Sequence, residues 1–419
     1  MNLSALQGSP ADDARCHCRA ERPVLMVLAA ARWDFDWQRP QQLLTRLAKH
    51  YRVFYIEAPR TTHRDPWLAC TPVAPGVEVL VAHTRCEAPG FADAQIPTMA
   101  ALLARLMGER GIVAPLAWLD TPAPRPLLEA LAPCAVIFDC QDDPAAADSR
   151  LRRHAAALLR EADLVLAAGP SLLAALRDRR GDARCIGAAV DAAHFAPPAP
   201  GGDAIEAVSA RAIHAAIPQP RLGFSGVIDE RIDLDLLARV AELRPDWQIV
   251  MAGPLRGVAA EALPRRANLL WLGAQTHAIL PHLQAHWDVG LLPLRVDACA
   301  TRATPIEALA LLAGARPVVA TPVADVVALY GHVVRVADGA AAFVDACRAA
   351  MCERGPLRRR RAADALIAAR SHGWDRAAER VHRLLAEITP APASPAATLP
   401  VQLLAGRGDA PAACRPAAR

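Results

Sequence analysis

The stretch from Thr304 to Val319 combines a helix start that could hold a phosphate group with a buried strand. Thr304 suits the N-cap of that helix, Pro305 suits its first position, and Glu307 can complete a capping box with Thr304. Backbone amides at the start of a helix attract phosphate groups, above all beside the carboxyl ends of parallel strands. We therefore expect this stretch to form the floor of a ligand cleft.

Two carboxylates, Asp139 and Asp142, follow a buried strand that we expect over 135–138. The carboxyl ends of parallel strands open onto the cleft of an α/β fold, so both side chains should face that cleft. A carboxylate in this place can orient a hydroxyl group or take its proton. In the alternative interpretation, Asp142, Asp143 and Pro144 only cap the next helix.

Aromatic and basic side chains follow the first strand, which we expect over 23–28. Trp33, Trp37 and Arg39 lie in this segment, and tryptophan rings suit stacking on the face of a sugar. For Trp37, packing in a core or between domains is the alternative.

The strands that would position these residues alternate with helices in two separate series. Short, continuous apolar runs such as the one at 23–28 are typical of strands buried inside parallel sheets. Alternation of strands and helices favours doubly wound sheets. The fold class we predict is α/β, with two Rossmann-like domains facing a central cleft.

The boundaries follow from where the two series begin and end. We expect a flexible N-terminus at 1–21, an N-terminal Rossmann-like domain at 22–198, a linker at 199–219, a C-terminal Rossmann-like domain at 220–372, a crossover helix at 373–388 and a disordered Ala/Pro-rich tail at 389–419.

Charge and hydropathy exclude several classes of protein. The net charge of +4 is spread over the chain without a basic block interleaved with aromatics, which argues against nucleic-acid binding. Residues 1–21 do not read as a signal peptide, and the longest apolar run, 24–31, is too short to cross a bilayer. We expect a cytoplasmic protein. The basic run at 358–361 leaves peripheral membrane contact open, the alternative being a solvated helix face.

Short motifs in a fixed order between residues 23 and 388 carry a family resemblance. They include Asp36-Trp-Gln-Arg-Pro-Gln-Gln-Leu43, Val136-Ile-Phe-Asp-Cys-Gln-Asp-Asp143, Gly169-Pro-Ser-Leu172, Gly223-Phe-Ser-Gly226, Gly253-Pro254 and Ala324-Asp-Val-Val-Ala-Leu-Tyr330. In this order they resemble the GT-B glycosyltransferases of the family 4-like kind, also called glycosyl transferases group 1.

The resemblance implies a glycosyltransferase of bacterial envelope or exopolysaccharide synthesis, with a nucleotide-sugar in the second domain and a glycan or glycolipid acceptor in the first. It implies no protein-bound metal and no cofactor besides the nucleotide-sugar substrate. Asp139 and Asp142 would be catalytic, and Trp33, Trp37 and Arg39 would bind the acceptor. The residues that we assign to donor binding are Gly226, Arg231, Gly253, Arg256, Arg302, Thr304 and Glu307, and the resemblance implies that the turn from Gly223 to Gly226 approaches the diphosphate.

The donor motif departs from the family pattern at two positions. The resembling enzymes have a lysine facing the diphosphate where this chain has Glu307, and a glutamate facing the ribose where it has Ala310. A pair of unit charges about 4 Å apart is worth roughly 4 kcal/mol at an effective dielectric near 20, so the sign matters. The alternative function is therefore a non-catalytic paralogue that binds a glycan, a nucleotide or a partner enzyme.

Overall fold

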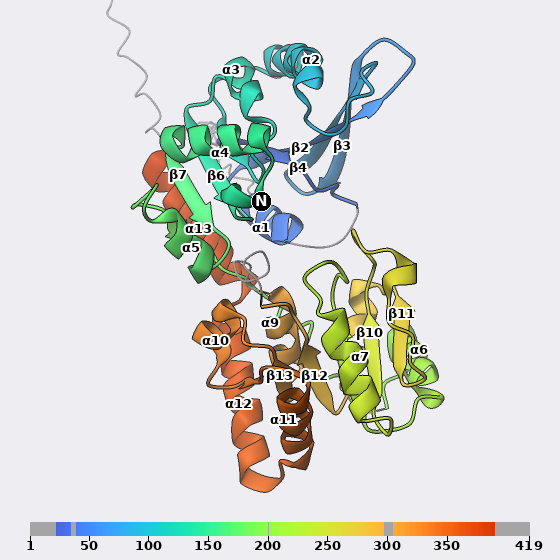
Figure 1. Cartoon of the computed structure of the whole chain (residues 1–419). Helices are drawn as coiled ribbons and strands as arrows, with labels where there is room; N and C mark the ends of the chain where they lie inside the picture. The colour runs from blue at the N-terminus through green and yellow to red at the C-terminus, as the bar shows by residue number, and fades with distance from the viewer. Residues whose placement is uncertain (1–21, 35–38, 200, 297–304, 390–419) are drawn as a thin grey trace, which may run out of the picture.

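The computed structural model describes residues 22–34, 39–199, 201–296 and 305–389, which form two α/β domains (Figure 1). Each domain is built around its own sheet, and neither sheet continues into the other. The expectation of two Rossmann-like domains is confirmed.

The first sheet has eight strands in the order β3-β4-β2-β1-β5-β6-β7-β8. All neighbours pair in parallel except β3 and β4, and β3 is a strand that the sequence analysis did not predict. The strands are β1 (Val24–Ala29), β2 (Arg52–Thr61), β3 (Trp67–Ala74), β4 (Val77–Thr84), β5 (Leu116–Leu119), β6 (Ala135–Cys140), β7 (Leu164–Ala167) and β8 (Arg184–Cys185).

Both faces of this sheet are buried, which explains why its central strands are continuous apolar runs. On β1, Leu25 and Val27 face one core, whereas Met26 and Leu28 face the other. The helices of the domain are α1 (Arg39–Leu47), α2 (Ile96–Glu109), α3 (Leu128–Leu131), α4 (Ser149–Glu161) and α5 (Pro170–Leu176).

The second sheet is entirely parallel, with six strands in the order β11-β10-β9-β12-β13-β14. Its strands are β9 (Arg221–Ser225), β10 (Gln248–Ala252), β11 (Leu269–Gly273), β12 (Val289–Leu292), β13 (Val318–Ala320) and β14 (Arg335–Val336). Its helices are α6 (Ile205–Ala215), α7 (Leu234–Leu243), α8 (Leu280–Ala285), α9 (Ile306–Ala313), α10 (Ala324–Tyr330), α11 (Ala340–Cys352) and α12 (Gly355–Ser371).

The segment 199–219, which we expected to be a linker, contains helix α6. Ala210 on this helix and Ile217 just after it belong to the core of the second domain. The interpretation as a linker was wrong for this part, because small residues such as alanine give a weak periodic signal although they pack closely.

The domains are joined where the chain crosses between them and by a hydrogen-bonded contact between α10 and α5. Val190, on the way into the second domain, pairs with Gly373 on the way back. The chain then enters α13 (Trp374–Ile388), which Figure 1 shows against the first domain beside β7 and α5. Asp325, at the start of α10, accepts hydrogen bonds from the backbone N–H (2.9 Å) and the hydroxyl (2.5 Å) of Ser171 in the first domain.

Gly223 in the middle of β9 is a packing residue rather than a ligand-facing one. A Cβ atom at this position would stand 1.9 Å from Cδ2 of Trp287, whose indole ring belongs to the core of the second domain. The indole N–H of Trp287 donates to Nε2 of His214 at 3.2 Å. The expectation that Gly223 approaches a diphosphate is therefore wrong, because the tryptophan occupies the space beside it.

We predict that Gly223→Ala lowers the free energy of unfolding by about 3 kcal/mol, because overpacking forces the Trp287 ring to move. Urea denaturation of the purified protein measures this. Gly108→Ala is the matched control, since a Cβ there meets nothing within 4 Å and alanine favours a helix by about 0.5–1 kcal/mol. Equal stability of the Gly223 variant and wild type would contradict the packing argument.

Candidate active site

A cleft of about 1230 Å³ lies between the two domains and is lined by residues from both. The first domain contributes the carboxyl ends of β1, β5 and β6, and the second contributes the carboxyl end of β9 and the start of α9. This is where open α/β folds bind their ligands. The cleft itself was expected from the sequence.

Three segments of the second domain converge at Gly226. A Cβ at Gly253 would lie 1.7 Å from the carbonyl oxygen of Gly226, so the turns after β9 and β10 touch through their backbones. A Cβ at Gly226 would lie 2.6 Å from Cγ of Glu307 at the start of α9. Both positions therefore require glycine, and the open side of Gly226 is covered by the Glu307 side chain.

Arg231 faces the cleft in an ion pair with Asp229. Its Nη2 lies 2.8 Å from Oδ2 of Asp229, and its Nε lies 3.0 Å from both carboxylate oxygens. Burial alone would lower the pKa of Arg231, but the hydrogen bonds to Asp229 and the charges of Glu307 and Asp142 raise it above its usual value. Arg231 is thus a permanent cation held in place on the same side of the cleft as Gly226.

Glu307 shares this environment. Burial raises the pKa of its carboxyl, and the nearby Arg231 opposes that rise. Helix α9 begins at Ile306 with Pro305 as its N-cap residue, one position later than expected. Ala310 lies one turn along the same helix, buried and lining the cleft.

Of the other residues predicted to bind the donor, one lines the cleft and two lie outside the described part of the chain. Arg256 is exposed and lines the cleft. Arg302 and Thr304 lie outside the described residues. Arg295, which the sequence analysis missed, also lines the cleft, and its backbone N–H donates to the carbonyl of Arg231 at 2.7 Å. Its position soon after the apolar run of β12 was the available signal.

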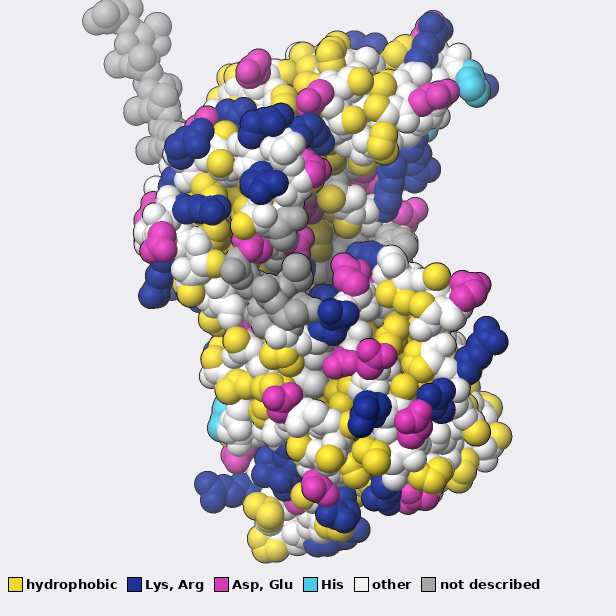
Figure 2. All heavy atoms as spheres, in the orientation of Figure 1, with side chains coloured by type: hydrophobic (Ala, Val, Ile, Leu, Met, Phe, Trp, Pro, Cys, Tyr) yellow, Lys and Arg dark blue, Asp and Glu magenta, His cyan; other side chains and the backbone are white. Residues whose placement is uncertain are grey.

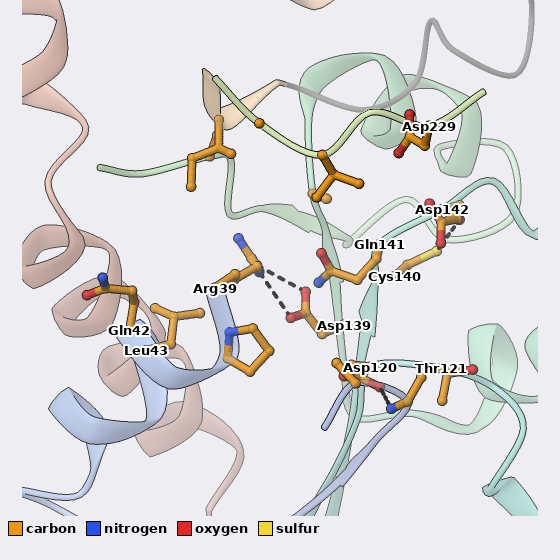
Figure 3. A pocket seen from close by; sticks show the side chains of 18 of the residues that line it. Arg39, Gln42, Leu43, Asp120, Thr121, Asp139, Cys140, Gln141, Asp142 and Asp229 are labelled. Atoms are coloured by element: carbon orange, nitrogen blue, oxygen red, sulfur yellow. Dashed lines mark hydrogen bonds and ion pairs between the residues drawn. The ribbon is translucent and has the colours of Figure 1, made fainter. Parts of the chain in front are cut away.

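On the first-domain wall, Asp139 is paired with Arg39 (Figure 3). Nη2 of Arg39 lies 3.1 Å from Oδ1 and Nε lies 3.4 Å from Oδ2, while Nη1 donates to the carbonyl of Ile186 at 2.8 Å. Asp139 is 3 % exposed and lies inside β6 rather than after it. Both predicted residues do line the cleft, but the pair joins α1, β6 and the end of β8, which favours a structural role over catalysis or acceptor binding.

Asp142 and Asp143 have separate roles. Asp143 accepts a hydrogen bond from the N–H of Ala145 at 3.0 Å and so caps a short turn, as in the alternative interpretation. Asp142 lies on the cleft wall with its side chain open to solvent. The surrounding cleft walls partly desolvate its carboxyl and raise its pKa, whereas the charge of Arg231 across the cleft lowers that pKa. Asp142 therefore keeps its place among the candidate residues.

Trp33 does not offer its ring to a ligand. It is 8 % exposed, belongs to a core of the first domain and packs edge-on against Tyr55 with ring centroids 5.1 Å apart. The prediction of acceptor stacking by Trp33 is wrong because its ring fills the space beside β2. Trp37 lies outside the described residues.

Asp120 is a cleft residue that the sequence analysis missed. It follows Leu119 at the end of β5, and its Oδ1 accepts a hydrogen bond from the N–H of Ala30 at 3.0 Å. Burial raises the pKa of Asp120 to about 7 although the Ala30 hydrogen bond lowers it, and the charges of Asp139 and Asp142 add to the rise. A polar residue directly after a buried strand was the signal for it.

No protein-family model matches the chain. TuaH of Bacillus subtilis (strain 168), named provisionally as a teichuronic acid biosynthesis glycosyltransferase, is 30% identical over 103 residues, which are 24% of this chain and 26% of that protein. The match thus spans about a quarter of this curated relative.

Solved structures match over most of the chain. Sucrose-phosphate synthase of Thermosynechococcus elongatus has a TM-score of 0.69 at 15% identity, covering 88% of this chain and 99% of that one. HepE of Anabaena in complex with UDP and glucose has a TM-score of 0.64 at 14% identity, covering 87% and 100%. The E. coli trehalose-6-phosphate structure bound with UDP-2-fluoro glucose has a TM-score of 0.66 at 13% identity, covering 88% and 100%. The chain therefore has the GT-B fold.

We predict that Asp139→Asn lowers the free energy of unfolding by about 3 kcal/mol, because it leaves the guanidinium of Arg39 without its anionic partner. Thermal and urea denaturation measure the loss. Asp142→Asn, on the same wall but exposed, should change stability by less than about 0.5 kcal/mol. If Asp139→Asn keeps full stability and loses only turnover, then Asp139 is catalytic and the structural interpretation is wrong.

Proposed function

We propose that this GT-B chain is a glycosyltransferase that moves a sugar from a nucleotide-sugar to a glycan or glycolipid acceptor. One observation carries the proposal: a turn with a glycine, Gly226, and a fixed cation, Arg231, line the second-domain side of the cleft and face carboxyl groups of the other domain. The turn and the cation suit a diphosphate, and the opposite wall suits the hydroxyl groups of an acceptor.

The donor we propose is a nucleoside diphosphate sugar held by the second domain. Two of the matching structures contain UDP with glucose and UDP-2-fluoro glucose. In our proposal the charge of the diphosphate is met by Arg231, Arg256 and Arg295 rather than by a protein-bound metal or a cofactor. Within the described ranges, no group of three or more His, Cys, Asp or Glu side chains is placed to hold a metal ion.

The acceptor we propose belongs to a bacterial envelope or exopolysaccharide, which is the finer expectation that the short match to TuaH supports. Helix α4 lines the cleft with Leu151 and Ala155 and exposes Arg152, Arg153 and Arg160 on its other side. Figure 2 shows Lys and Arg side chains gathered over this part of the first domain. In our proposal this face meets an anionic glycolipid at the cytoplasmic membrane surface. No helix of the described part is long and apolar enough to cross a membrane.

The non-catalytic alternative is favoured by the acidity of the cleft. Among the described residues that line it, eight carry carboxyl groups and four carry guanidinium groups. The Glu307 side chain moreover covers Gly226, where a diphosphate would approach the backbone. Such a cleft would bind a diphosphate weakly unless the carboxyls are protonated or displaced.

A panel of UDP-, GDP-, ADP- and dTDP-sugars tests the proposed function. Thermal shift and calorimetric titration measure binding, and release of the nucleoside diphosphate measures slow hydrolysis in the absence of an acceptor. Binding and hydrolysis of at least one donor would support a glycosyltransferase. Binding without hydrolysis or transfer would favour the non-catalytic alternative, and the absence of any binding would contradict the donor site.

We predict that Glu307→Gln raises the affinity for UDP about 10-fold and Glu307→Lys about 100-fold, because the first removes the negative charge beside Gly226 and the second replaces it with a positive one. Isothermal titration of the purified variants measures the affinities. Glu242→Gln is the control, because Glu242 pairs with Arg266 outside the cleft lining. If UDP affinity stays constant across the Glu307 series, Glu307 does not face the diphosphate.

A further inference from the structure

We propose that three residues at the outer end of the first sheet, Arg60, Trp67 and His83, form a platform for an acidic sugar unit of the acceptor. Such a unit carries a carboxylate or a phosphate group. The inference rests on the proposed glycosyltransferase function and adds to it a chemical class for the acceptor chain. None of the three residues belongs to the sequence motifs discussed above, and none lines the cleft between the domains.

The pairing of three strands places the platform residues on one face of the sheet. His83, near the end of β4, pairs with Arg60 of β2 and with Trp67 of β3. Side chains that stand opposite each other on paired strands point to the same side of the sheet. The indole of Trp67 stacks on the imidazole of His83, with ring centroids 4.0 Å apart and planes inclined by 6°. Figure 1 shows these strands projecting from the first domain as an arm.

Trp67 keeps a large aromatic surface in contact with water. Among the described residues, it is the only Trp, Tyr or Phe with an exposed side chain, at 42 %. It belongs to none of the apolar cores of the described chain, and His83 covers one face of its ring. An exposed indole suits stacking on the apolar face of a sugar, and tryptophan and arginine are the residues that carry most binding energy at interfaces.

The charges around the platform are positive. Partial burial lowers the pKa of His83, and the charges of Arg60 and Arg32 lower it further, so its imidazole is mainly neutral above pH 7. Arg32 already has a carboxylate partner, Glu57, at 2.7 Å. No hydrogen bond or ion pair joins Arg60 to another described residue. The guanidinium of Arg60 is therefore open to a carboxylate or a phosphate, which it can bind through two parallel hydrogen bonds.

The platform continues the edge of the cleft outward. Strands β4, β2 and β1 are neighbours, and Ala30 and Ala31, which follow β1, line the cleft. The next residue, Arg32, reaches Glu57 of β2. Two strand spacings, about 10 Å, separate β1 from β4. Figure 2 shows Lys and Arg side chains gathered under the projecting strands, on the side toward the second domain. An acceptor of several sugar units that ends in the cleft can therefore place an acidic unit on the platform.

Binding of short sugar chains to the purified protein tests the platform. The probes are three trimers with the same linkage: one of glucose, one of glucuronic acid, and one of glucose that carries a terminal phosphate group. Isothermal titration at low salt measures each Kd. We expect the acidic trimers to bind at least about 5-fold more tightly than the glucose trimer, because only they meet the charge of Arg60. The acidic trimer that binds more tightly identifies the anionic group as a carboxylate or a phosphate.

Substitutions separate the two parts of the platform. Arg60→Gln should lower the affinity for the acidic trimers about 5-fold and remove their advantage over the glucose trimer. Trp67→Ala should lower the affinity for the acidic trimers about 10-fold, and Trp67→Phe should retain part of it, because a smaller ring can still stack. Arg359→Gln, an exposed change on α12, is the control for charge. Val73→Ala, at the other end of β3, is the control for loss of exposed apolar surface.

Three results would overturn the inference. If wild type binds acidic and neutral trimers equally, or if Arg60→Gln behaves like Arg359→Gln, the platform does not select an acidic sugar. If both Trp67 variants keep wild-type affinity and Trp67→Ala alone lowers the Tm, the ring stack only stabilises the arm. If Trp67→Ala keeps that affinity and converts a dimer into a monomer in sedimentation, the exposed edge of β3 pairs with a second copy of the chain.

The platform and the proposed function can fail independently. Binding of the acidic trimers by a protein that binds no nucleotide-sugar would support the platform and favour the non-catalytic, glycan-binding alternative. Binding and hydrolysis of a nucleotide-sugar by a protein that binds no acidic trimer would support the proposed function and contradict the platform.

Discussion

The contact between Ser171 and Asp325 is the constraint on which the geometry of the cleft depends. Asp325 is fully buried, and a carboxylate in that position must be stabilised by donors, which Ser171 supplies with its backbone N–H and its hydroxyl. Asp325 belongs to the second domain and Ser171 belongs to the first. Since each wall of the cleft also belongs to a different domain, this contact and the pairing of Val190 with Gly373 decide which residues face each other.

The carboxyl groups that line the cleft differ in whether an arginine pairs with them, and this decides which of them can meet a ligand. Arg39 fixes Asp139 in the first domain, and Arg231 is fixed by Asp229 in the second. In the first case the pair is buried and joins three elements, whereas in the second the guanidinium is left facing the cleft. Asp120 has the backbone N–H of Ala30 as its partner instead of a cation. Its pKa is therefore raised by burial, whereas a paired arginine would have lowered it.

The fold was predictable because strands buried on both faces, such as β1, are continuous apolar runs, and such runs leave few alternatives. The cleft followed, since parallel strands place their carboxyl ends together. The role of a single side chain was harder to predict. Trp33 follows a strand as a ligand-binding residue would, yet its ring turns into the core, and Gly223 is glycine because of Trp287, which lies far along the chain. Such contacts join distant segments, and local patterns do not record them.

Asp120 was missed for a related reason. Its neighbours in the chain form an ordinary strand end, and its chemical interest comes from Ala30, Asp139 and Asp142, which other parts of the chain supply. Arg295 likewise gains its place from the backbone of Arg231. By contrast, Gly226 and Gly253 were both named as donor residues from the sequence, and each glycine follows a strand of the same sheet.

Trp374 gives the molecule a built-in optical reporter. It begins the helix that returns to the first domain, is 3 % exposed among Leu43, Ala189 and Ala378, and reaches the lining of the cleft. Indole emission shifts in wavelength with the polarity of its surroundings. The chain holds eight tryptophans, and a substrate that fills the cleft or turns one domain against the other would change the wavelength of the Trp374 contribution to their emission, without any label attached to the protein.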